Sequence, residues 1–102
     1  MENSKTFSLA SGNVNSNEFN LAADIVKKLI KTPDNDELLH LYGFYKQATV
    51  GDNNQPAPGF LDFKGKSKHN AWLQCKGISV FDSEIKYITY VNELIKKYGI
   101  NQ

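Results

Sequence analysis

The chain has 102 residues, a formal net charge of +1 and 12% aromatic residues. This length suits one domain and is too short for two, and the near-zero charge argues against a general nucleic-acid-binding protein. All 12 basic residues are lysines, which lack the planar fork with which arginine reads base edges, so binding of phosphate groups stays open while base reading is disfavoured.

The single cysteine, Cys75, excludes an internal disulfide and a cysteine-based metal site. A domain that folds without disulfides suits a reducing compartment, and we expect a cytoplasmic protein. The first residues contain no apolar stretch of the kind found in secretory signals. No run of about eighteen apolar residues exists that could cross a membrane.

The N-terminal residues 1–16 are rich in Asn and Ser, and we expect a flexible tail followed by one domain at residues 17–102. A first helix is predicted from Asn15 or Ser16, either of which can cap it, to Thr32, where Pro33 stops it. Its apolar residues recur at three- and four-residue steps, as on one face of a helix: Phe19, Ala22, Ala23, Val26, Leu29 and Ile30.

A second helix is predicted to begin at Asp34, with Glu37 completing a capping box, and to end at Gly51–Asp52. One face of this helix carries Leu38, Leu41, Tyr42, Tyr45, Ala48 and Thr49. The segment 52–62 holds two Asn, two Pro and Gly59, a composition typical of a loop.

A third helix is predicted at residues 65–76, with Ala71, Trp72 and Cys75 on its inner face and Gly77 after its end. Ser79 with Asp82 indicates the start of a fourth helix that ends at Gly99 and in which Glu93 pairs with Lys97. Its apolar stripe is Phe81, Ile85, Ile88, Val91, Ile95 and Tyr98, widened by Tyr87, Tyr90 and Leu94. No segment alternates apolar and polar residues convincingly, so the sequence predicts an all-α fold of four helices.

The sequence contains no catalytic motif of the common nucleophile, zinc, phosphate-loop or dinucleotide types. His40 and His69 stand apart from each other, and we expect both to be surface or half-buried residues. Cys75 lies on an apolar helix face and is expected to pack as a small hydrophobe. We therefore expect a protein that is not an enzyme and that needs no metal or cofactor.

Lysines and tyrosines offer a better candidate for a site. Tyr42, Tyr45 and Lys46 share one face of the second helix. Three lysines gather at the start of the third helix, where free backbone N–H groups add to the attraction for phosphate: Lys64, Lys66 and Lys68. Taken alone, these residues indicate only a ligand with a phosphate and a ring. A solvated helix start and core packing of the tyrosines remain as alternatives.

The sequence YGFYKQATVGD at residues 42–52, with PGFLDFKGKSK at residues 58–68, resembles the signature of the acyl-CoA-binding protein family. The pairs Ala71–Trp72 and Lys76–Gly77, with Ser79 after them, and KKYGI at residues 96–100 agree with it. The resemblance extends from about residue 17 to residue 100. It implies an up-down-down-up bundle of four helices and the reversible binding of medium- and long-chain fatty acyl-CoA esters.

The resemblance also implies which residues bind the ligand: Lys27, Tyr42, Tyr45, Lys46, Lys64, Lys68 and Tyr87. In this reading Lys46 and Lys68 meet the 3′-phosphate of the CoA ribose, and the tyrosines contact the adenine nucleotide. The positions at which the first and fourth helices pack are Phe19, Ala23, Val26, Leu29, Ile88, Val91 and Leu94. Two departures stand out, because His69 occupies a position where many members carry Trp and Cys75 replaces a larger apolar residue.

The function implied is that of an intracellular carrier that forms an acyl-CoA pool and makes transient contacts with acyl-CoA-using enzymes. It would act as a monomer, without nucleic acid and without stable membrane insertion. The first alternative is a signalling or protein-interaction peptide of the same family. The second is a thioesterase or acyltransferase.

Overall fold

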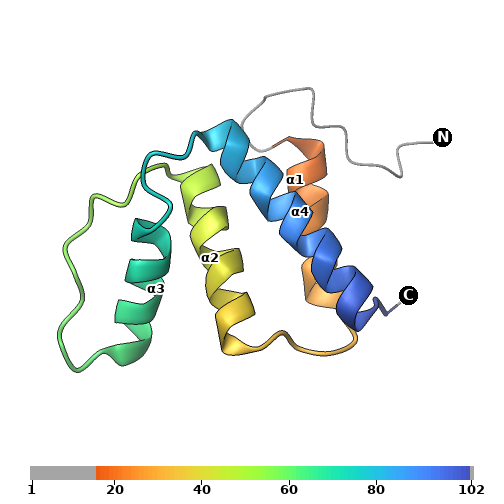
Figure 1. The fold of residues 1–102 in the computed structure, drawn as a ribbon, viewed down its shortest axis with the longest axis horizontal. Helices are drawn as coiled ribbons and strands as arrows, with labels where there is room; N and C mark the ends of the chain where they lie inside the picture. Colours follow the sequence, from red (N-terminus) through yellow and green to blue (C-terminus); the bar gives the residue numbers. More distant parts are fainter. Residues whose placement is uncertain (1–15, 102) are drawn as a thin grey trace.

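The computed structural model describes residues 16–101, which form four α-helices and one short 3₁₀ turn (Figure 1). These are α1 (Asn17–Ile25), η1 (Val26–Lys28), α2 (Asn35–Thr49), α3 (Phe63–Leu73) and α4 (Val80–Tyr98). Helices α2 and α3 run in one direction, and α1 and α4 run in the other, as Figure 1 shows. The predicted all-α, up-down-down-up bundle is confirmed. The predicted tail lies outside the described residues, apart from Ser16. None of the described helices is long and apolar enough to cross a bilayer.

Each α-helix starts at a side chain that accepts a hydrogen bond from a backbone N–H of its first turn. The predicted caps Ser16, Asp34 and Ser79 do so, and Asp34 forms the predicted capping box with Glu37. Helix α3 begins two residues before the predicted Gly65, because Asp62 accepts from the Gly65 N–H at 2.9 Å. It also ends earlier than predicted, at Leu73, and a turn connects it to Gly77.

The prediction that the first helix continues to Thr32 is wrong. Helical structure stops at Lys28, and Leu29 is extended with ψ at 137°. The chain end returns to this segment, where Ile30 N–H donates to the Gly99 carbonyl at 2.9 Å and Asn101 N–H donates to the Lys28 carbonyl at 2.8 Å. Leu29 and Ile100 thus form a single antiparallel bridge, which satisfies backbone groups that a longer helix would have bonded internally.

Helix α4 supplies the centre of the core and packs against both α1 and α2. Its buried apolar residues meet Phe19 and Ala22 of α1 and Leu41 and Ala48 of α2: Tyr87, Ile88, Val91 and Leu94. The implied packing of the first helix on the fourth is confirmed, with Ala23, Val26 and Leu29 partly buried against the same cluster. Phe81 and Ile85 of the predicted stripe are only half-buried, while Ser83 and Glu84 between them are buried.

Helix α3 lies close to α2 and to no other described helix, and Gly43 is the point of closest approach. A Cβ atom on Gly43 would lie 2.7 Å from the Ala71 carbonyl oxygen and 3.3 Å from the Cys75 sulfur. Cys75 is buried here, as expected for a small hydrophobe. The absence of a side chain at Gly43 therefore allows α3 to approach α2 this closely.

A group of hydrogen bonds, here called the polar clamp, fixes the C-terminal end of α3 and the turn after it to the end of α2. The buried Gln47 donates to Asp52 Oδ1 at 2.8 Å and to the Ile78 carbonyl at 2.9 Å. The same Asp52 oxygen accepts the Gly77 N–H at 2.9 Å. The Gly77 bond, and then that of Gln47, lowers the pKa of Asp52. Trp72 completes the clamp by donating its indole N–H to the Gly51 carbonyl at 2.7 Å.

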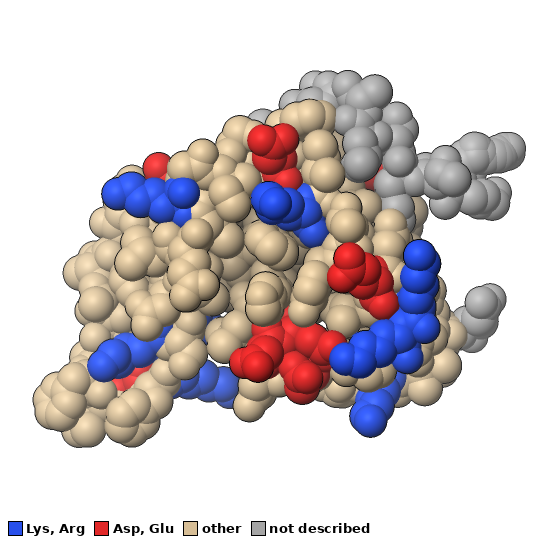
Figure 2. Space-filling view, viewed as in Figure 1, with Lys and Arg blue, Asp and Glu red and all other residues tan. Residues whose placement is uncertain are grey.

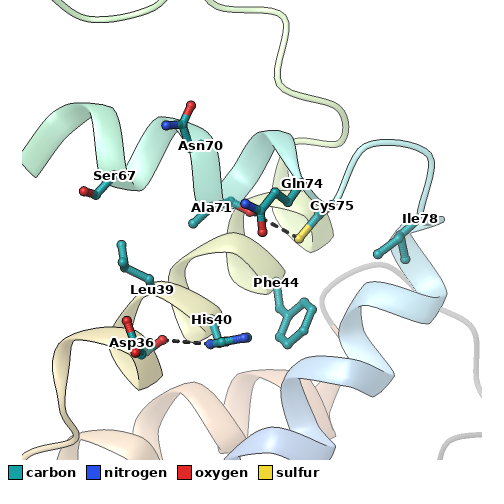
Figure 3. Close-up of a pocket in the computed structure, with 10 residues that line it drawn as sticks. All are labelled: Asp36, Leu39, His40, Phe44, Ser67, Asn70, Ala71, Gln74, Cys75 and Ile78. Carbon is teal, nitrogen blue, oxygen red and sulfur yellow. Dashed lines mark hydrogen bonds between the residues drawn. The ribbon is translucent and has the colours of Figure 1, made fainter. Parts of the chain in front are cut away.

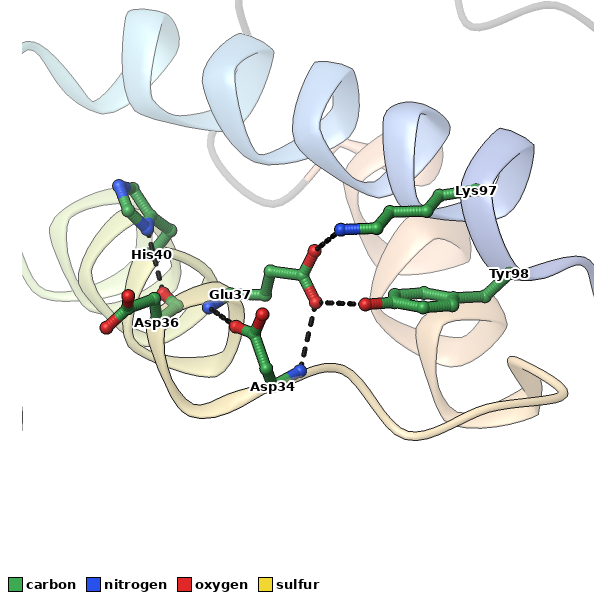
Figure 4. Close-up of polar contacts among 6 residues, drawn as sticks. All are labelled: Asp34, Asp36, Glu37, His40, Lys97 and Tyr98. Atoms are coloured by element: carbon green, nitrogen blue, oxygen red, sulfur yellow. Dashed lines mark hydrogen bonds and ion pairs between the residues drawn. The ribbon is translucent and has the colours of Figure 1, made fainter.

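A second polar group joins the start of α2 to the end of α4 (Figure 4). The Glu37 carboxylate lies 2.7 Å from the Lys97 ammonium and accepts from the Tyr98 hydroxyl at 2.6 Å. It also accepts the Asp34 N–H at 2.9 Å. The Lys97 and Tyr98 bonds, with that of Asp34, lower the pKa of Glu37 to about 2. Lys97 thus pairs across to α2, and the predicted pairing with Glu93 is wrong.

We predict that Gly43→Ala destabilises the protein by about 1–3 kcal/mol, since the added methyl group forces α3 away from α2. Gly59→Ala, where a Cβ would meet no atom within 4 Å, is the matched control and should stay within about 0.5 kcal/mol of the wild type. Urea unfolding measures both. Equal stabilities for the two variants would contradict the close approach described here.

We further predict acid sensitivity from Glu37. Its folded-state pKa is about 2 against a usual value of 4.5, so its contribution to stability is present above about pH 4.5 and is lost as the pH falls towards 2. The melting temperature of Glu37→Gln should therefore lie below that of the wild type at neutral pH, and the gap should narrow across this window. Glu93→Gln, at an exposed position of α4, is the control for removal of one carboxylate. A gap that is constant with pH would refute the prediction.

Candidate functional site

Helices α2 and α3 leave a groove on either side of their contact. The first, here called the charged groove, has a volume of about 350 Å³. It is lined by the first halves of both helices: Asn35, Leu38, Leu39 and Tyr42 of α2, and Phe63, Lys64, Ser67 and Lys68 of α3. It brings together three of the predicted ligand residues, Tyr42, Lys64 and Lys68. Both apolar side chains and cations line this groove.

Two lysines of the site lie over aromatic rings. The Lys68 ammonium is 5.6 Å from the centre of the Tyr42 ring, and the Lys46 ammonium is 5.0 Å from the Trp72 ring. Tyr42 and Lys46 are one turn apart on α2, and Lys68 and Trp72 are one turn apart on α3. Because the two helices run in the same direction, the pairs form successive contacts across the helix pair (Figure 1). Lys68 lines the charged groove, whereas Lys46 and Trp72 line neither groove. Cation–π attraction holds both ammonium groups against the α2–α3 pair while leaving their N–H donors available.

Tyr45 and Tyr87 belong to a different aromatic cluster, where α1, α2 and α4 meet. The Tyr45 ring stacks on Phe19 at a centroid distance of 5.5 Å, and Tyr87 lies 5.1 Å from Phe19 and 5.7 Å from Tyr45. Tyr45 is 40% exposed, whereas Tyr87 is 4% exposed. Burial raises the pKa of Tyr87 to about 12. Tyr87 therefore packs in the core, which was the alternative left open for the tyrosines. Tyr45 presents an accessible surface.

Lys27 is placed apart from both grooves. It lies on η1, is exposed, and lines neither of them. His69 also lines neither groove. Its carbonyl accepts from the Asn53 side chain at 3.2 Å, and its ring nitrogen lies 3.1 Å from the same amide. His69 therefore holds the long loop against α3.

The second groove, here called the outer cleft, has a volume of about 480 Å³ and lies on the other side of the α2–α3 contact (Figure 3). Its lining includes Leu39, Phe44 and Cys75, and the carboxylate of Asp36 lies at one end. His40 lines it as well, with its ring nitrogen 2.8 Å from the Asp36 carbonyl and its ring 5.4 Å from that of Tyr90. No lysine lines this cleft. An anionic ligand is thus better served by the charged groove.

Sequence reasoning missed part of the lining of the charged groove. Leu38 was placed on the apolar face of α2, but it is 42% exposed and faces the groove together with Phe63. The role of Trp72 as the ring beneath Lys46 was not predicted either. The spacing of Leu38 matched the apolar face of α2, so the sequence carried no signal that would have set it apart from the core residues.

The chemistry of the described residues favours binding. Residues 16–101 contain no group of three or more His, Cys, Asp or Glu side chains that could hold a metal ion. Burial raises the pKa of the Cys75 thiol, an effect that Lys86 only partly offsets, so the thiol is a poor nucleophile. The charged groove combines the cations of Lys64 and Lys68 with the apolar side chains of Leu38, Leu39 and Phe63.

Comparison with known sequences gives consistent results. The sequence profile of the acyl CoA binding protein family matches residues 16–91. The chain is 51% identical over 84 residues to an "Acyl-CoA-binding protein homolog" of Drosophila melanogaster, covering 82% of this chain and 98% of that protein. It is 51% identical over 81 residues to "Acyl-CoA-binding protein homolog 1" of Caenorhabditis elegans, covering 79% of this chain and 94% of that protein.

Solved structures with a similar fold include Oryza sativa Acyl-CoA-Binding Protein 2, with a TM-score of 0.75 and 39% identity, over 78% of this chain and 87% of that one. The Moniliophthora perniciosa structure titled ACBP gives a TM-score of 0.74 and 42% identity, over 78% and 79% of the two chains. The solution structure of the yeast Acyl Coenzyme A Binding Protein has a TM-score of 0.66 and 46% sequence identity, over 82% of this chain and 98% of that one.

The placement of the tyrosines predicts different roles for Tyr87 and Tyr42. Tyr87→Ala should lower the free energy of unfolding by about 3–5 kcal/mol, because it leaves a cavity in the core. Tyr42→Ala, at a half-buried groove position, should cost clearly less. Denaturant unfolding tests this, with Tyr87→Phe as the control that keeps the ring. A larger loss for Tyr42→Ala than for Tyr87→Ala would overturn the assignment.

Proposed function

This chain belongs to the acyl-CoA-binding protein family, and from that premise we propose that it binds medium- and long-chain fatty acyl-CoA esters and carries them as an intracellular pool. The observation that carries the proposal is the charged groove, in which cations lie next to exposed apolar side chains. An acyl-CoA ester has the same division, with phosphates on its head and a hydrocarbon tail. A ligand with only one of these parts would leave half of the groove unused.

The head group is assigned to the lysines and to the accessible tyrosine rings. Lys46 and Lys68 are assigned to the 3′-phosphate of the ribose, since both ammonium groups are held over rings of the α2–α3 pair and keep their donors free. Lys64 lines the same groove and is assigned to the remaining phosphates. Tyr42 and Tyr45 offer partly exposed rings for the adenine.

Tyr87 and Lys27 are assigned to the site on family resemblance, with less support from the geometry. Tyr87 lies beneath Tyr45 and Phe19, so its proposed part is to support the accessible ring from below. Lys27 is exposed on η1 and would reach the ligand only from outside the groove.

The acyl chain is assigned to the apolar part of the groove at Leu38, Leu39 and Phe63. Burying each methylene group contributes about 0.8 kcal/mol before ordering costs. Affinity should therefore rise with acyl-chain length, and free CoA should bind poorly. The exposed surface of Leu38 and Phe63 is then covered only when the tail is present.

We infer a carrier that does no chemistry on its ligand, because the family to which the chain belongs is one of binding proteins. A cytoplasmic location, a monomeric state and transient contacts with acyl-CoA-using enzymes complete the proposal. A signalling peptide is the alternative. No described feature favours it over the carrier.

Calorimetric titration with palmitoyl-CoA tests the proposal, with free CoA and palmitate as control ligands. We expect one-to-one binding of the ester that is much tighter than that of either part. Lys68→Ala removes a charge-assisted contact and should weaken binding by about 10–100-fold. Lys66 is on the same helix but does not line the groove, so solvent would screen its charge from the ligand. Lys66→Ala should therefore change the affinity by less than about twofold.

Two results would count against the carrier. Failure to bind the ester would move the signalling-peptide alternative to first place. Consumption of palmitoyl-CoA by the pure protein on long incubation, lost in Cys75→Ala or another point variant, would indicate an enzyme.

A further inference from the structure

The most exposed large apolar side chains of the described residues stand together at one end of the molecule. Phe60 is 75% exposed, and Leu61 and Phe63 are each 71% exposed. These three residues, here called the apolar tip, lie where the long loop enters α3. In Figure 2 the lower left end of the molecule, over this loop and the start of α3, is an uncharged projection with basic side chains beside it. An exposed apolar surface of this kind marks an interaction site more often than an accident of folding.

The tip is presented on a fixed turn. Asp62 N–H donates to the Gly59 carbonyl at 3.0 Å, which closes a turn with Phe60 and Leu61 at its corners. The Asp62 carboxylate then caps α3 through the Gly65 N–H. Because the turn is already ordered, the tip loses little conformational entropy when it binds to a partner surface.

Three lysines follow the apolar tip in the sequence. Lys64 and Lys66 lie in the first turns of α3, and Lys68 follows. The one acidic residue between positions 59 and 70 is Asp62, whose carboxylate is occupied by the helix cap. Exposed apolar side chains followed directly by lysines match the interface of an anionic bilayer, where hydrocarbon lies beneath negative head groups.

We propose that the apolar tip docks this protein reversibly on anionic membrane surfaces, with Phe60, Leu61 and Phe63 in the interface and Lys64 and Lys66 against the head groups. A lipid surface fits better than a protein pocket, because the tip is convex and the basic residues that follow it are all lysines, which suit phosphates without fixed geometry. Docking by three side chains is weak and readily reversed. Phe63 and Lys64 also line the charged groove, so docking brings one end of that groove to the membrane.

Co-sedimentation of the full chain with vesicles tests the proposal, using phosphatidylcholine alone and phosphatidylcholine mixed with phosphatidylserine. The wild type should partition onto the mixed vesicles, less onto the neutral ones, and less as salt is raised. Phe60→Ser/Leu61→Ser should reduce the partition coefficient by about tenfold or more. The matched control is Leu21→Ser/Val50→Ser, which removes two exposed apolar side chains elsewhere and should leave partitioning unchanged. Lys66→Ala should weaken binding to the mixed vesicles only.

A second measurement locates the contact. Phe60→Trp should be quenched by brominated lipids, and Val50→Trp should show only the background of the buried Trp72. The proposal is overturned if the wild type does not bind the mixed vesicles, if both double variants bind equally, or if the two tryptophan variants are quenched alike. Calorimetry with palmitoyl-CoA on Phe60→Ser/Leu61→Ser keeps the two proposals separate, because these residues lie outside the charged groove and ligand binding should persist.

Discussion

The contact between α2 and α3 is the constraint on which the rest of the structure depends. Helix α3 has no other helical neighbour among the described residues, so its place depends on its contact with α2, which includes the close approach at Gly43 and the polar clamp. Both grooves are lined by residues of α2 and α3, so both depend on how these two helices pack. If α3 moved, the ammonium of Lys68 would leave the Tyr42 ring and Trp72 would leave Lys46. The core around α4 would remain, but the site would not.

The signature at residues 42–52 serves two purposes on alternate faces of α2. Tyr42, Tyr45 and Lys46 present accessible rings and a charge, whereas Gln47 and Asp52 hold the turn before α4. Such a motif looks like a continuous ligand site when read as a sequence. In three dimensions its second half, with Gln47 and Asp52, is structural and holds the end of α3. The length of the motif therefore reflects structural needs as well as the proposed site.

Helix starts could be predicted from the sequence because each depends on a side chain within one turn, as Asp34 and Ser79 illustrate. What the sequence did not reveal is decided by distant partners. The first helix ends early because Ile100, near the end of the chain, pairs with Leu29. The side chain of Lys97 forms its ion pair with Glu37 of α2 instead of with a residue of its own helix. For the site, spacing was enough to place Tyr42 and the lysines of α3 near one another. It could not show that Tyr87 is buried or that Leu38 is exposed, since burial depends on which helix packs against which face.

The segment from Gly59 to Lys68 connects the two proposals physically. Its turn presents the apolar tip, and its next residues, Phe63 and Lys64, line the charged groove. An anionic membrane surface and the head group of an acyl-CoA would therefore compete for Lys64, and hydrocarbon from either source would cover Phe63. Because Lys64 and Phe63 cannot contact the membrane and the ligand at the same time, the protein docked on a membrane should bind acyl-CoA more weakly than the protein in solution. A carrier built this way holds its ligand firmly in solution and loosely where the acyl chain has a bilayer to enter.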